Sequence, residues 1–305
     1  MRAFVTGGRG FVGGWLRAHL EEQGDEVLAP DVDVTDAEGV RKAMVEAEPD
    51  AVYHLAGIAS VAQSWQEPME TFRVNAGGTL AVLEGARAVA DERRLTPRVL
   101  IVASAEVYGK ATPDQLPLTE DCDLRPATPY AASKVAAEFV GLQAFLGYGL
   151  PVLRVRAFNH VGPGQGPDFV VSGIARQVVE VEQGKRDVVR VGNLTVRRDF
   201  TDVRDVVRSY RLLVERGEPG QVYNVCSGRD LAVSELVERT LALSGVEARV
   251  ETDPDLLRPV DVPVLRGDPT RLRTVTGWEP AFTLDETLTD VLAWWRRVGP
   301  DGAAG

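Results

Sequence analysis

Residues 2–13 read Arg-Ala-Phe-Val-Thr-Gly-Gly-Arg-Gly-Phe-Val-Gly, an apolar run followed by three glycines spaced three residues apart. The run of residues 3–5 is typical of a buried parallel strand, and the apolar positions of residues 15–20 recur with the period of a helix. A glycine turn between a strand and a helix lets the backbone approach a pyrophosphate, which the helix N-terminus attracts. The segment therefore predicts a nucleotide pocket at the start of an α/β chain.

Three further apolar runs, at residues 26–28, 51–57 and 99–103, alternate with helical patterns. This alternation predicts an α/β fold with a doubly wound parallel (Rossmann) sheet. The run at 51–57 ends in small residues where a dinucleotide needs room, and we interpret its His54 as a hydrogen-bonded histidine of structural use. The run at 99–103 delivers Ser104 to the carboxyl edge of the sheet, where ligands of open α/β sheets bind.

Tyr130 and Lys134 lie four residues apart, so a helix over this segment presents both on one face. An ammonium near a phenol favours the phenolate and would lower the pKa of Tyr130. Tyr130 could then exchange a proton with a sugar or alcohol oxygen that Ser104 holds by a hydrogen bond. The pattern is weak alone and gains its weight from the glycine turn and strand that precede it.

Two residues of opposite charge bear on the choice of dinucleotide. Asp31 follows the strand 26–28 at the distance where an acidic residue meets the adenosine ribose, and its carboxylate would repel a 2′-phosphate. Arg9, inside the glycine turn, would instead attract that phosphate. The sequence therefore predicts NAD(H) or NADP(H) as cofactor, with a slight preference for NAD(H).

Composition favours a cytoplasmic enzyme. The formal charge of -11 over 305 residues, with no basic stripe, argues against nucleic acid or an anionic membrane as partner. No apolar run has the length of a membrane span, and the N-terminus has no signal-type segment. Cys122 and Cys226 lie far apart without metal-ligand spacing, which predicts a reducing compartment and no metal site.

These features resemble the extended short-chain dehydrogenase/reductase superfamily. In the first half the resemblance rests on residues 6–13, 33–36, 54–57, 73–75, 104–109 and 130–134. The second half resembles enzymes that act on GDP-mannose and its 4-keto-6-deoxy derivative, through residues 158–165, 191–194, 198–205, 223–228 and 257–263. The most similar group is the GDP-4-dehydro-6-deoxy-D-mannose reductases, which make GDP-D-rhamnose, and the resemblance covers nearly the whole chain.

The resemblance implies NAD(P)H-dependent reduction of the C4 ketone of a GDP-linked 4-keto-6-deoxyhexose, a nucleotide-sugar substrate. The residues it implies for catalysis are Ser104, Glu106, Tyr130 and Lys134. For the cofactor it implies Gly7, Arg9, Gly10, Phe11, Val12, Gly13, Asp31, Asp33, Val34, Leu55, Ala56, Gly57, Asn75, Tyr130, Lys134 and Phe158. For the substrate it implies Ser104, Glu106, Asn159, Arg176, Val191, Asn193, Arg198, Arg258 and Asp261, the arginines matching diphosphate or sugar contacts.

Glu106 keeps an alternative open, because a glutamate two residues after Ser104 also matches 4,6-dehydratases. In those enzymes the carboxylate removes the C5 proton so that hydroxide can leave from C6, and the cofactor is regenerated. A GDP-mannose or other nucleotide-hexose 4,6-dehydratase and a nucleotide-sugar 4-epimerase are therefore the competing hypotheses. A dinucleotide sensor without activity is disfavoured, since Tyr130 and Lys134 are both present.

The sequence also predicts how the chain is divided. A dinucleotide-binding Rossmann domain is expected to comprise residues 1–159 and about 202–227, and a smaller, discontinuous C-terminal substrate lobe about 160–201 and 228–305. The resemblance implies a homodimer that pairs through the helices starting near Pro68 and Tyr130. Trp294 and Trp295 are interpreted as aromatics that pack a helix.

Overall fold

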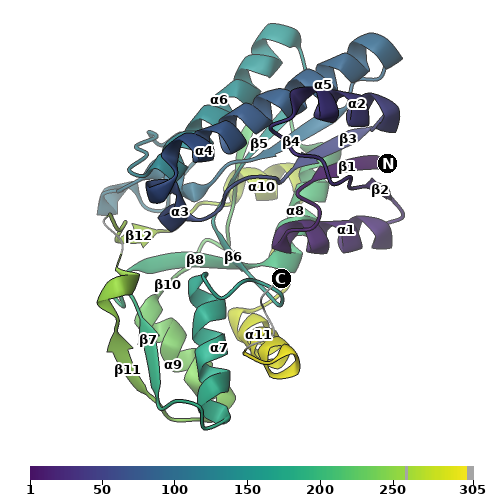
Figure 1. Cartoon of the computed structure of the whole chain (residues 1–305). Coiled ribbons are helices and arrows are strands. Elements are labelled where there is room, and N and C mark those ends of the chain that lie inside the picture. The colour runs from purple at the N-terminus through teal and green to yellow at the C-terminus, as the bar shows by residue number, and fades with distance from the viewer. Residues whose placement is uncertain (258–259, 301–305) are drawn as a thin grey trace.

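A six-stranded parallel sheet forms the centre of this computed structural model, which describes residues 1–257 and 260–300. Its strands follow the order β2-β1-β3-β4-β5-β9 (Figure 1). They are β1 (Arg2–Thr6), β2 (Glu26–Leu28), β3 (Ala51–His54), β4 (Arg98–Val102), β5 (Val152–Ala157) and β9 (Val222–Val225). The predicted doubly wound parallel sheet is confirmed.

The pairing register of β1, β3 and β4 places the carboxyl ends of these strands at the same level. Thr6 at the end of β1 pairs with His54 at the end of β3, and His54 pairs with Ile101 near the end of β4. Segments that leave these three strands therefore start at one edge of the sheet. That edge carries the glycine turn, residues 55–57 and Ser104.

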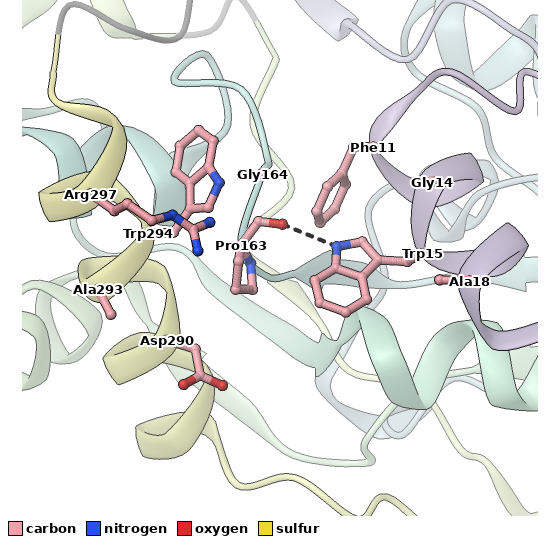
Figure 2. Close-up of a pocket in the computed structure, with 10 residues that line it drawn as sticks. All are labelled: Phe11, Gly14, Trp15, Ala18, Pro163, Gly164, Asp290, Ala293, Trp294 and Arg297. Carbon is pink, nitrogen blue, oxygen red and sulfur yellow. Dashed lines mark hydrogen bonds between the residues drawn. The ribbon is translucent and has the colours of Figure 1, made fainter. Parts of the chain in front are cut away.

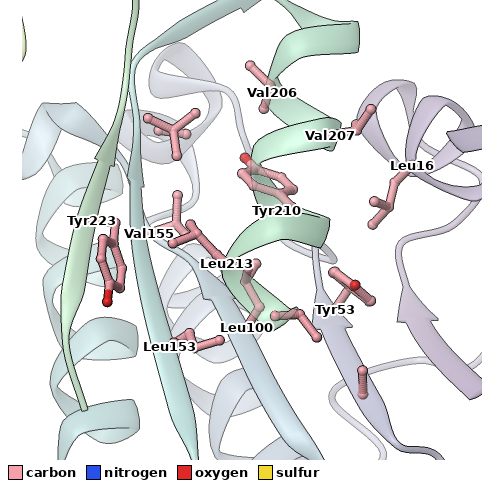
Figure 3. Packing of buried hydrophobic residues seen from close by; sticks show 14 of the residues in the cluster. Leu16, Tyr53, Leu100, Leu153, Val155, Val206, Val207, Tyr210, Leu213 and Tyr223 are labelled. Atoms are coloured by element: carbon pink, nitrogen blue, oxygen red, sulfur yellow. The ribbon is translucent and has the colours of Figure 1, made fainter. Parts of the chain in front are cut away.

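Helices cover both faces of the sheet. On one face lie α1 (Phe11–Glu22) and α8 (Val203–Arg216), whose apolar sides pack on the strands through residues such as Leu16, Tyr53, Leu100, Tyr210 and Tyr223 (Figure 3). The other face carries α2 (Ala37–Ala47), α5 (Gly78–Arg93) and α6 (Pro129–Tyr148). Helix α6 begins with Pro129 at its first position and with a hydrogen bond from the Ala131 amide to Thr128 Oγ1 (3.0 Å), a standard start for a helix.

Short helical segments border the carboxyl edge of the sheet. They are α3 (Val61–Gln66), α4 (Pro68–Phe72), the π-helical turn η1 (Arg73–Gly77), and the 3₁₀ turns η2 (Ala105–Tyr108) and η3 (Pro113–Gln115). Turn η2 follows β4 directly, and Ser104 is its N-cap. The turn therefore fixes where Ser104 stands relative to the sheet.

The second half forms most of a smaller lobe beside this edge (Figure 1). The lobe contains β6 (Asn159–Val161), α7 (Val170–Glu182), β7 (Val188–Val191), β8 (Arg197–Asp202), β10 (Asp230–Ala232), α9 (Val233–Ser244), β11 (Arg249–Thr252), η4 (Pro254–Leu256), β12 (Val264–Leu265) and α11 (Leu284–Val298). Helix α10 (Thr270–Thr276) packs instead with the main sheet. Strand β8 pairs with β10, β12 and β6, and β7 pairs with β11. Buried Ile174, Leu236 and Trp295 are part of a separate apolar core under these strands.

Packing bears on the predicted boundary between the two lobes. Strand β9 pairs with β5 in the main sheet, and Leu272 of α10 and Trp278 lie in the core of that sheet. Residues near 270–278 thus pack with the Rossmann sheet, although the sequence groups them with the smaller lobe. The division into two domains stays a prediction. No helix in the described ranges is both long and apolar enough to cross a membrane.

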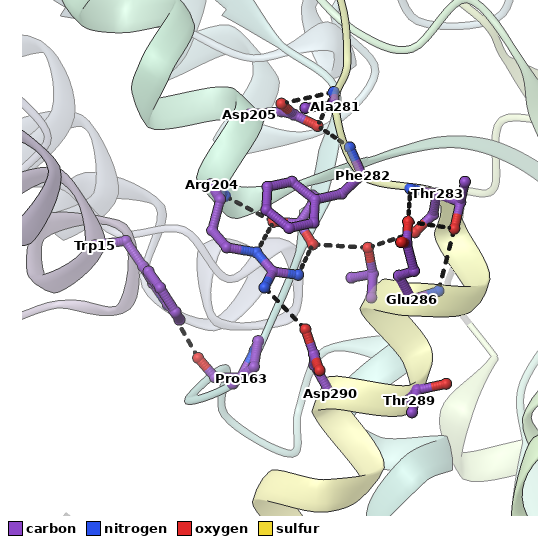
Figure 4. Close-up of polar contacts among 12 residues, drawn as sticks. Trp15, Pro163, Arg204, Asp205, Ala281, Phe282, Thr283, Glu286, Thr289 and Asp290 are labelled. Carbon is purple, nitrogen blue, oxygen red and sulfur yellow. Dashed lines mark hydrogen bonds and ion pairs between the residues drawn. The ribbon is translucent and has the colours of Figure 1, made fainter.

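A polar cluster joins α8 to α11. Arg204 pairs with Asp202 (2.7 Å) and with Asp290 of α11 (2.8 Å), and its guanidinium lies 3.7 Å from the ring centroid of Phe282 (Figure 4). Buried Asp205 accepts hydrogen bonds from the Ala281 and Phe282 amides. The cluster satisfies charges at the start of α8 and holds the last helix against the sheet domain.

Candidate active site

The glycine turn is packed too tightly to admit side chains. Gly7 has a φ of +69°, and a Cβ there would lie 2.8 Å from the amide nitrogen of Ala56. A Cβ on Gly13 would lie 2.1 Å from the carbonyl oxygen of Gly7. Gly10, the N-cap of α1, offers no side chain to the first helical amides. This cradle fits the pyrophosphate of a dinucleotide, which those amides would bind.

Arg9 and Asp31, which make opposing predictions about the cofactor, contact each other. Arg9 Nη1 donates to Asp31 Oδ2 at 2.5 Å, and both side chains are exposed. The pair lies in the segments that follow β1 and β2. Because Arg9 and Asp31 are paired, neither charge would act on the adenosine ribose of a cofactor independently of the other.

Asp33 and Val34, two further residues predicted to bind the cofactor, lie in the segment that follows β2. Asp33 Oδ1 accepts hydrogen bonds from the amide and hydroxyl of Thr35, and these bonds lower the pKa of the Asp33 carboxyl. Val34 is buried against Gly78, where a Cβ would lie 2.7 Å from Val34 Cγ2. Asp33 thus orders its own turn, and Val34 fixes that turn to α5.

Asn75 ties the end of β3 to the helix that carries Tyr130. Its side chain accepts from the Ile58 amide (2.8 Å) and donates to the Ile58 carbonyl (3.1 Å) and to Ser133 Oγ (2.9 Å). Asn75 sits in the π-helical turn η1, a backbone feature frequent at functional sites. Gly57, after Leu55 and Ala56, has room only for hydrogen, since a Cβ would lie 2.8 Å from Asn75 Oδ1.

Tyr130 and Ser104 are buried next to each other. Burial raises the pKa of Tyr130 to about 12, the nearby Ser104 hydroxyl opposes this rise, and the charge of Glu106 adds to it. Lys134 does not lower the pKa of Tyr130, although the sequence predicts that it should. Its Nζ donates to the Val102 carbonyl at 2.9 Å, and burial lowers the pKa of its own ammonium to about 8.

The predicted lowering of the Tyr130 pKa by Lys134 is therefore wrong for this structure. Helical spacing places the two side chains on one face, as expected, but it does not report how deeply the phenol is buried. Desolvation of the buried phenolate is the largest cause and raises the pKa, while the Lys134 ammonium donates to the Val102 carbonyl. Tyr130 is consequently protonated near neutral pH.

Glu106 lies close to Ser104 and Tyr130, and its backbone contacts Ser104. Its amide donates to Ser104 Oγ at 3.2 Å, and its half-buried carboxyl group belongs to the same 3₁₀ turn. The structure thus brings Ser104, Glu106 and Tyr130 together. His54, by contrast, is satisfied by Thr6 (2.8 Å) and Thr79 (3.0 Å), and burial lowers its pKa to about 3, which confirms a structural role.

The rings of Phe158 and Phe11, both predicted to contact the cofactor, lie against other side chains. The Phe158 ring is buried in a cluster with Tyr108 and Cys226. The Phe11 ring stacks on His160 with centroids 6.3 Å apart. Only the backbone of Phe11 and Val12 belongs to the cradle at the start of α1.

Three predicted substrate residues meet at the edge of the smaller lobe. Arg198 donates to Asp261 Oδ1 (2.9 Å) and to the Val262 carbonyl (2.7 Å), while Asn193 donates to Asp261 Oδ2 (3.2 Å). Arg198 is buried, so its guanidinium orders the loop around residue 261 in this structure. Arg258 lies outside the described residues.

The other predicted substrate residues are more scattered. Asn159 is half-buried at the start of β6, and Val191 turns its side chain into the core of the smaller lobe. Arg176 on α7 lies 3.8 Å from Glu180. The structure therefore does not gather these three with Arg198 into a single cluster of contacts.

A cavity of about 600 Å³ lies between α1, the Pro163–Gly164 loop and α11 (Figure 2). Trp15, whose Nε1 donates to the Pro163 carbonyl at 3.0 Å, and Trp294 form part of its wall. Trp295 is fully buried and donates to Ser172, as a packing aromatic should. The interpretation of this pair as packing residues thus holds for Trp295, whereas Trp294 borders the cavity.

Sequence reasoning missed a buried polar network behind the catalytic residues. Glu138 is one helical turn after Lys134 on the same face of α6, and it accepts two hydrogen bonds from Arg156 of β5. Tyr108 and Asn224 extend this network. The available signal was a charged residue continuing the four-residue spacing of Tyr130 and Lys134.

The parallel sheet, the glycine cradle and the buried Ser104–Tyr130 pair beside Lys134 define a Rossmann-fold enzyme of the extended short-chain dehydrogenase/reductase type. The model of the GDP-mannose 4,6 dehydratase family matches residues 29–291, and the chain belongs to this family. GDP-6-deoxy-D-mannose reductase of Pseudomonas aeruginosa is 38% identical over 299 residues, covering 96% of this chain and 97% of that protein.

A plant relative is less similar in sequence, and a solved bacterial structure shares the fold. GDP-mannose 4,6 dehydratase 2 of Arabidopsis thaliana is 32% identical over 258 residues, covering 84% of this chain and 68% of that protein. A solved structure of RMD from Pseudomonas aeruginosa complexed with NADPH has a TM-score of 0.89 at 36% identity and covers 97% of this chain and 99% of that one.

Proposed function

We propose that this chain uses NAD(P)H to reduce the C4 ketone of a GDP-linked 4-keto-6-deoxyhexose, giving GDP-D-rhamnose. The buried Ser104–Tyr130 pair at the carboxyl edge of the sheet carries the proposal. Similarity to a GDP-6-deoxy-D-mannose reductase along almost the whole chain supports the substrate class.

In this mechanism C4 of the sugar would receive a hydride from the reduced nicotinamide of a bound cofactor. Ser104 donates a hydrogen bond to the ketone oxygen, and Tyr130 Oη transfers its proton to that oxygen as negative charge develops there. A phenol with a pKa of about 12 is a competent donor, because an alkoxide is a stronger base than a phenolate. Lys134, whose Nζ donates to the Val102 carbonyl at the end of β4, would bind the nicotinamide ribose.

Sequence similarity supports reduction over dehydration. The GDP-6-deoxy-D-mannose reductase of Pseudomonas aeruginosa is 38% identical to this chain, whereas the GDP-mannose 4,6 dehydratase 2 of Arabidopsis thaliana is 32% identical. The position of Glu106 beside Tyr130 is the observation that keeps the dehydratase as the second candidate.

A pair of assays separates these reactions. With GDP-4-keto-6-deoxymannose we expect NADPH or NADH to be consumed in proportion to a C4 alcohol, measured by absorbance and by mass of the product. With GDP-mannose alone we expect no change. Conversion of GDP-mannose without added reductant would identify a dehydratase and overturn the proposed function.

We propose that both dinucleotides are accepted, with NADH slightly preferred, and that the Arg9–Asp31 pair sets the ratio. Asp31 would accept hydrogen bonds from a 2′-hydroxyl, whereas a 2′-phosphate would replace Asp31 as the partner of Arg9. We expect Arg9→Ala to weaken NADPH relative to NADH by about 2- to 5-fold, and Asp31→Ala to shift the ratio the other way, since exposed ion pairs have small effects. Fluorescence titration checks this, and an unchanged ratio in both variants would exclude the pair.

We further propose a homodimer formed through α4 and α6. These helices pack against each other and expose Met69 (82%) and Phe72 on α4, and Phe139 and Leu146 (72%) on α6. Such a group of exposed apolar side chains is typical of an interface. We expect the native chain to sediment as a dimer and Phe139→Glu to sediment as a monomer; a native monomer at micromolar concentration would contradict the proposal.

The free cysteines Cys122 and Cys226 support a cytoplasmic location, where thiols stay reduced and NAD(P)H is supplied.

A further inference from the structure

Arg156 contacts both structural elements that carry the catalytic groups. Its Nε and Nη2 donate to the two carboxylate oxygens of Glu138 at 2.9 and 2.7 Å, and Glu138 lies on the helix of Tyr130 and Lys134. Its Nη1 donates to Tyr108 Oη at 3.0 Å, and Tyr108 ends the turn that begins after Ser104. One guanidinium thus connects helix α6 to turn η2.

The contacts are buried and leave little freedom. Glu138 is fully buried and the Arg156 side chain is 5% exposed. The guanidinium lies 4.9 Å from the Tyr108 ring centroid and also donates to the Glu120 carbonyl at 2.9 Å. Charge-assisted bonds in such surroundings are short and directional, so they fix the relative position of the groups that make them.

Tyr108 is held from its other side as well. Its hydroxyl donates to Asn224 Oδ1 at 2.6 Å, and Asn224 of β9 donates to the Leu118 carbonyl at 2.8 Å. The network therefore spans η2, β5, β9 and α6. None of its members is assigned a role in the proposed reaction.

We propose that Arg156 is a positioning residue that sets the distance between Ser104 and Tyr130. It fixes α6 through Glu138 and η2 through Tyr108, so that the serine hydroxyl and the phenol meet at one point beside the C4 oxygen. This inference rests on the proposed function for its kinetic test, although the geometry it describes does not.

Arg156→Lys is the informative change, because lysine keeps the charge but lacks the planar fork that serves Glu138 and Tyr108 together. We expect kcat to fall about 10- to 100-fold, as for other small misplacements of catalytic groups, with the dinucleotide Kd changed less than about 3-fold. Arg154→Lys is the matched control. Arg154 is buried two residues away on the same strand and reaches Glu138 at 3.4 Å, but no hydrogen bond links it to η2. We expect it to keep kcat within about 2-fold, because it leaves the link to the Ser104 turn intact.

A double-mutant cycle separates positioning from general destabilisation. If Arg156 acts through Ser104, then Ser104→Ala combined with Arg156→Lys loses little more than Ser104→Ala alone. The proposal would be overturned if the kcat losses of Ser104→Ala and Arg156→Lys multiplied in the double variant. It would also be overturned if Arg154→Lys lost as much kcat as Arg156→Lys, or if Arg156→Lys left kcat unchanged. Should Arg156→Lys fail to fold, Tyr108→Phe removes only the link to η2 and must show the same non-additivity with Ser104→Ala.

Crystal structures of the Arg156→Lys and Arg154→Lys variants give a readout that is independent of turnover. We expect the distance between Ser104 Oγ and Tyr130 Oη to change in the first and to stay at its native value in the second. An unchanged distance in Arg156→Lys would refute the positioning role, even if the native chain reduced no ketone. Conversely, an inactive native chain in which only Arg156→Lys changes this distance would reject the proposed function and keep this inference.

Discussion

Tyr130→Phe is expected to lower kcat for ketone reduction by about 10³-fold, within the range that a general acid contributes. The change removes the proton that C4 oxygen receives and leaves Ser104 as its remaining hydrogen-bond donor in the mechanism proposed above. The dinucleotide Kd should change less than about 2-fold, because the cradle at Gly7–Gly13 and the Lys134–Val102 contact are untouched. Absorbance of NADPH measures turnover, and fluorescence titration measures binding.

Tyr148→Phe is the matched control, since Tyr148 ends the same helix, is 49% exposed and lies over Arg87 rather than in the site. It should keep full activity. If Tyr130→Phe retained more than about a tenth of native turnover, the phenol could not be the proton donor. A dinucleotide sensor without activity would show no turnover in either protein, so the native assay distinguishes that alternative.

Local patterns predicted the parts of the site that depend on backbone periodicity. The glycine spacing located the cradle, and the four-residue spacing located Tyr130 and Lys134 on one face of α6. The run at 99–103 also placed Ser104 after the fourth strand. Each of these follows from strand or helix geometry, which a sequence displays directly.

The sequence could not predict how deeply side chains are buried or which residues they pair with. The pKa of Tyr130 depends on how completely the fold removes water from around its phenol. Lys134 donates a hydrogen bond to the Val102 carbonyl of β4. Arg198 was expected to meet phosphate, yet its partner Asp261 is distant in sequence. Pairings between distant residues arise from tertiary packing, and no local spacing reports them.

The second large effect is expected for Gly13→Ala. A Cβ at this position would lie 2.1 Å from the Gly7 carbonyl and 2.7 Å from Gly8 Cα, so the turn itself must move. Overpacking of this kind costs about 1–3 kcal/mol of folding stability. The movement also displaces the amides that face the pyrophosphate. Losing two charge-assisted hydrogen bonds, at about 1.5 kcal/mol each, would weaken dinucleotide binding by roughly 100-fold.

Gly14→Ala provides the control at the adjacent residue. Gly14 is exposed, it lies inside α1, and a Cβ there meets no atom within 4 Å. Alanine should therefore raise the free energy of unfolding by about 0.5–1 kcal/mol and leave the dinucleotide Kd unchanged. Denaturant unfolding and fluorescence titration measure the two quantities. Equally tight binding of NADH and NADPH by Gly13→Ala and Gly14→Ala would contradict this prediction. It would mean that position 13 does not need glycine for the backbone to approach a pyrophosphate, and that the cradle lies elsewhere along the sheet edge.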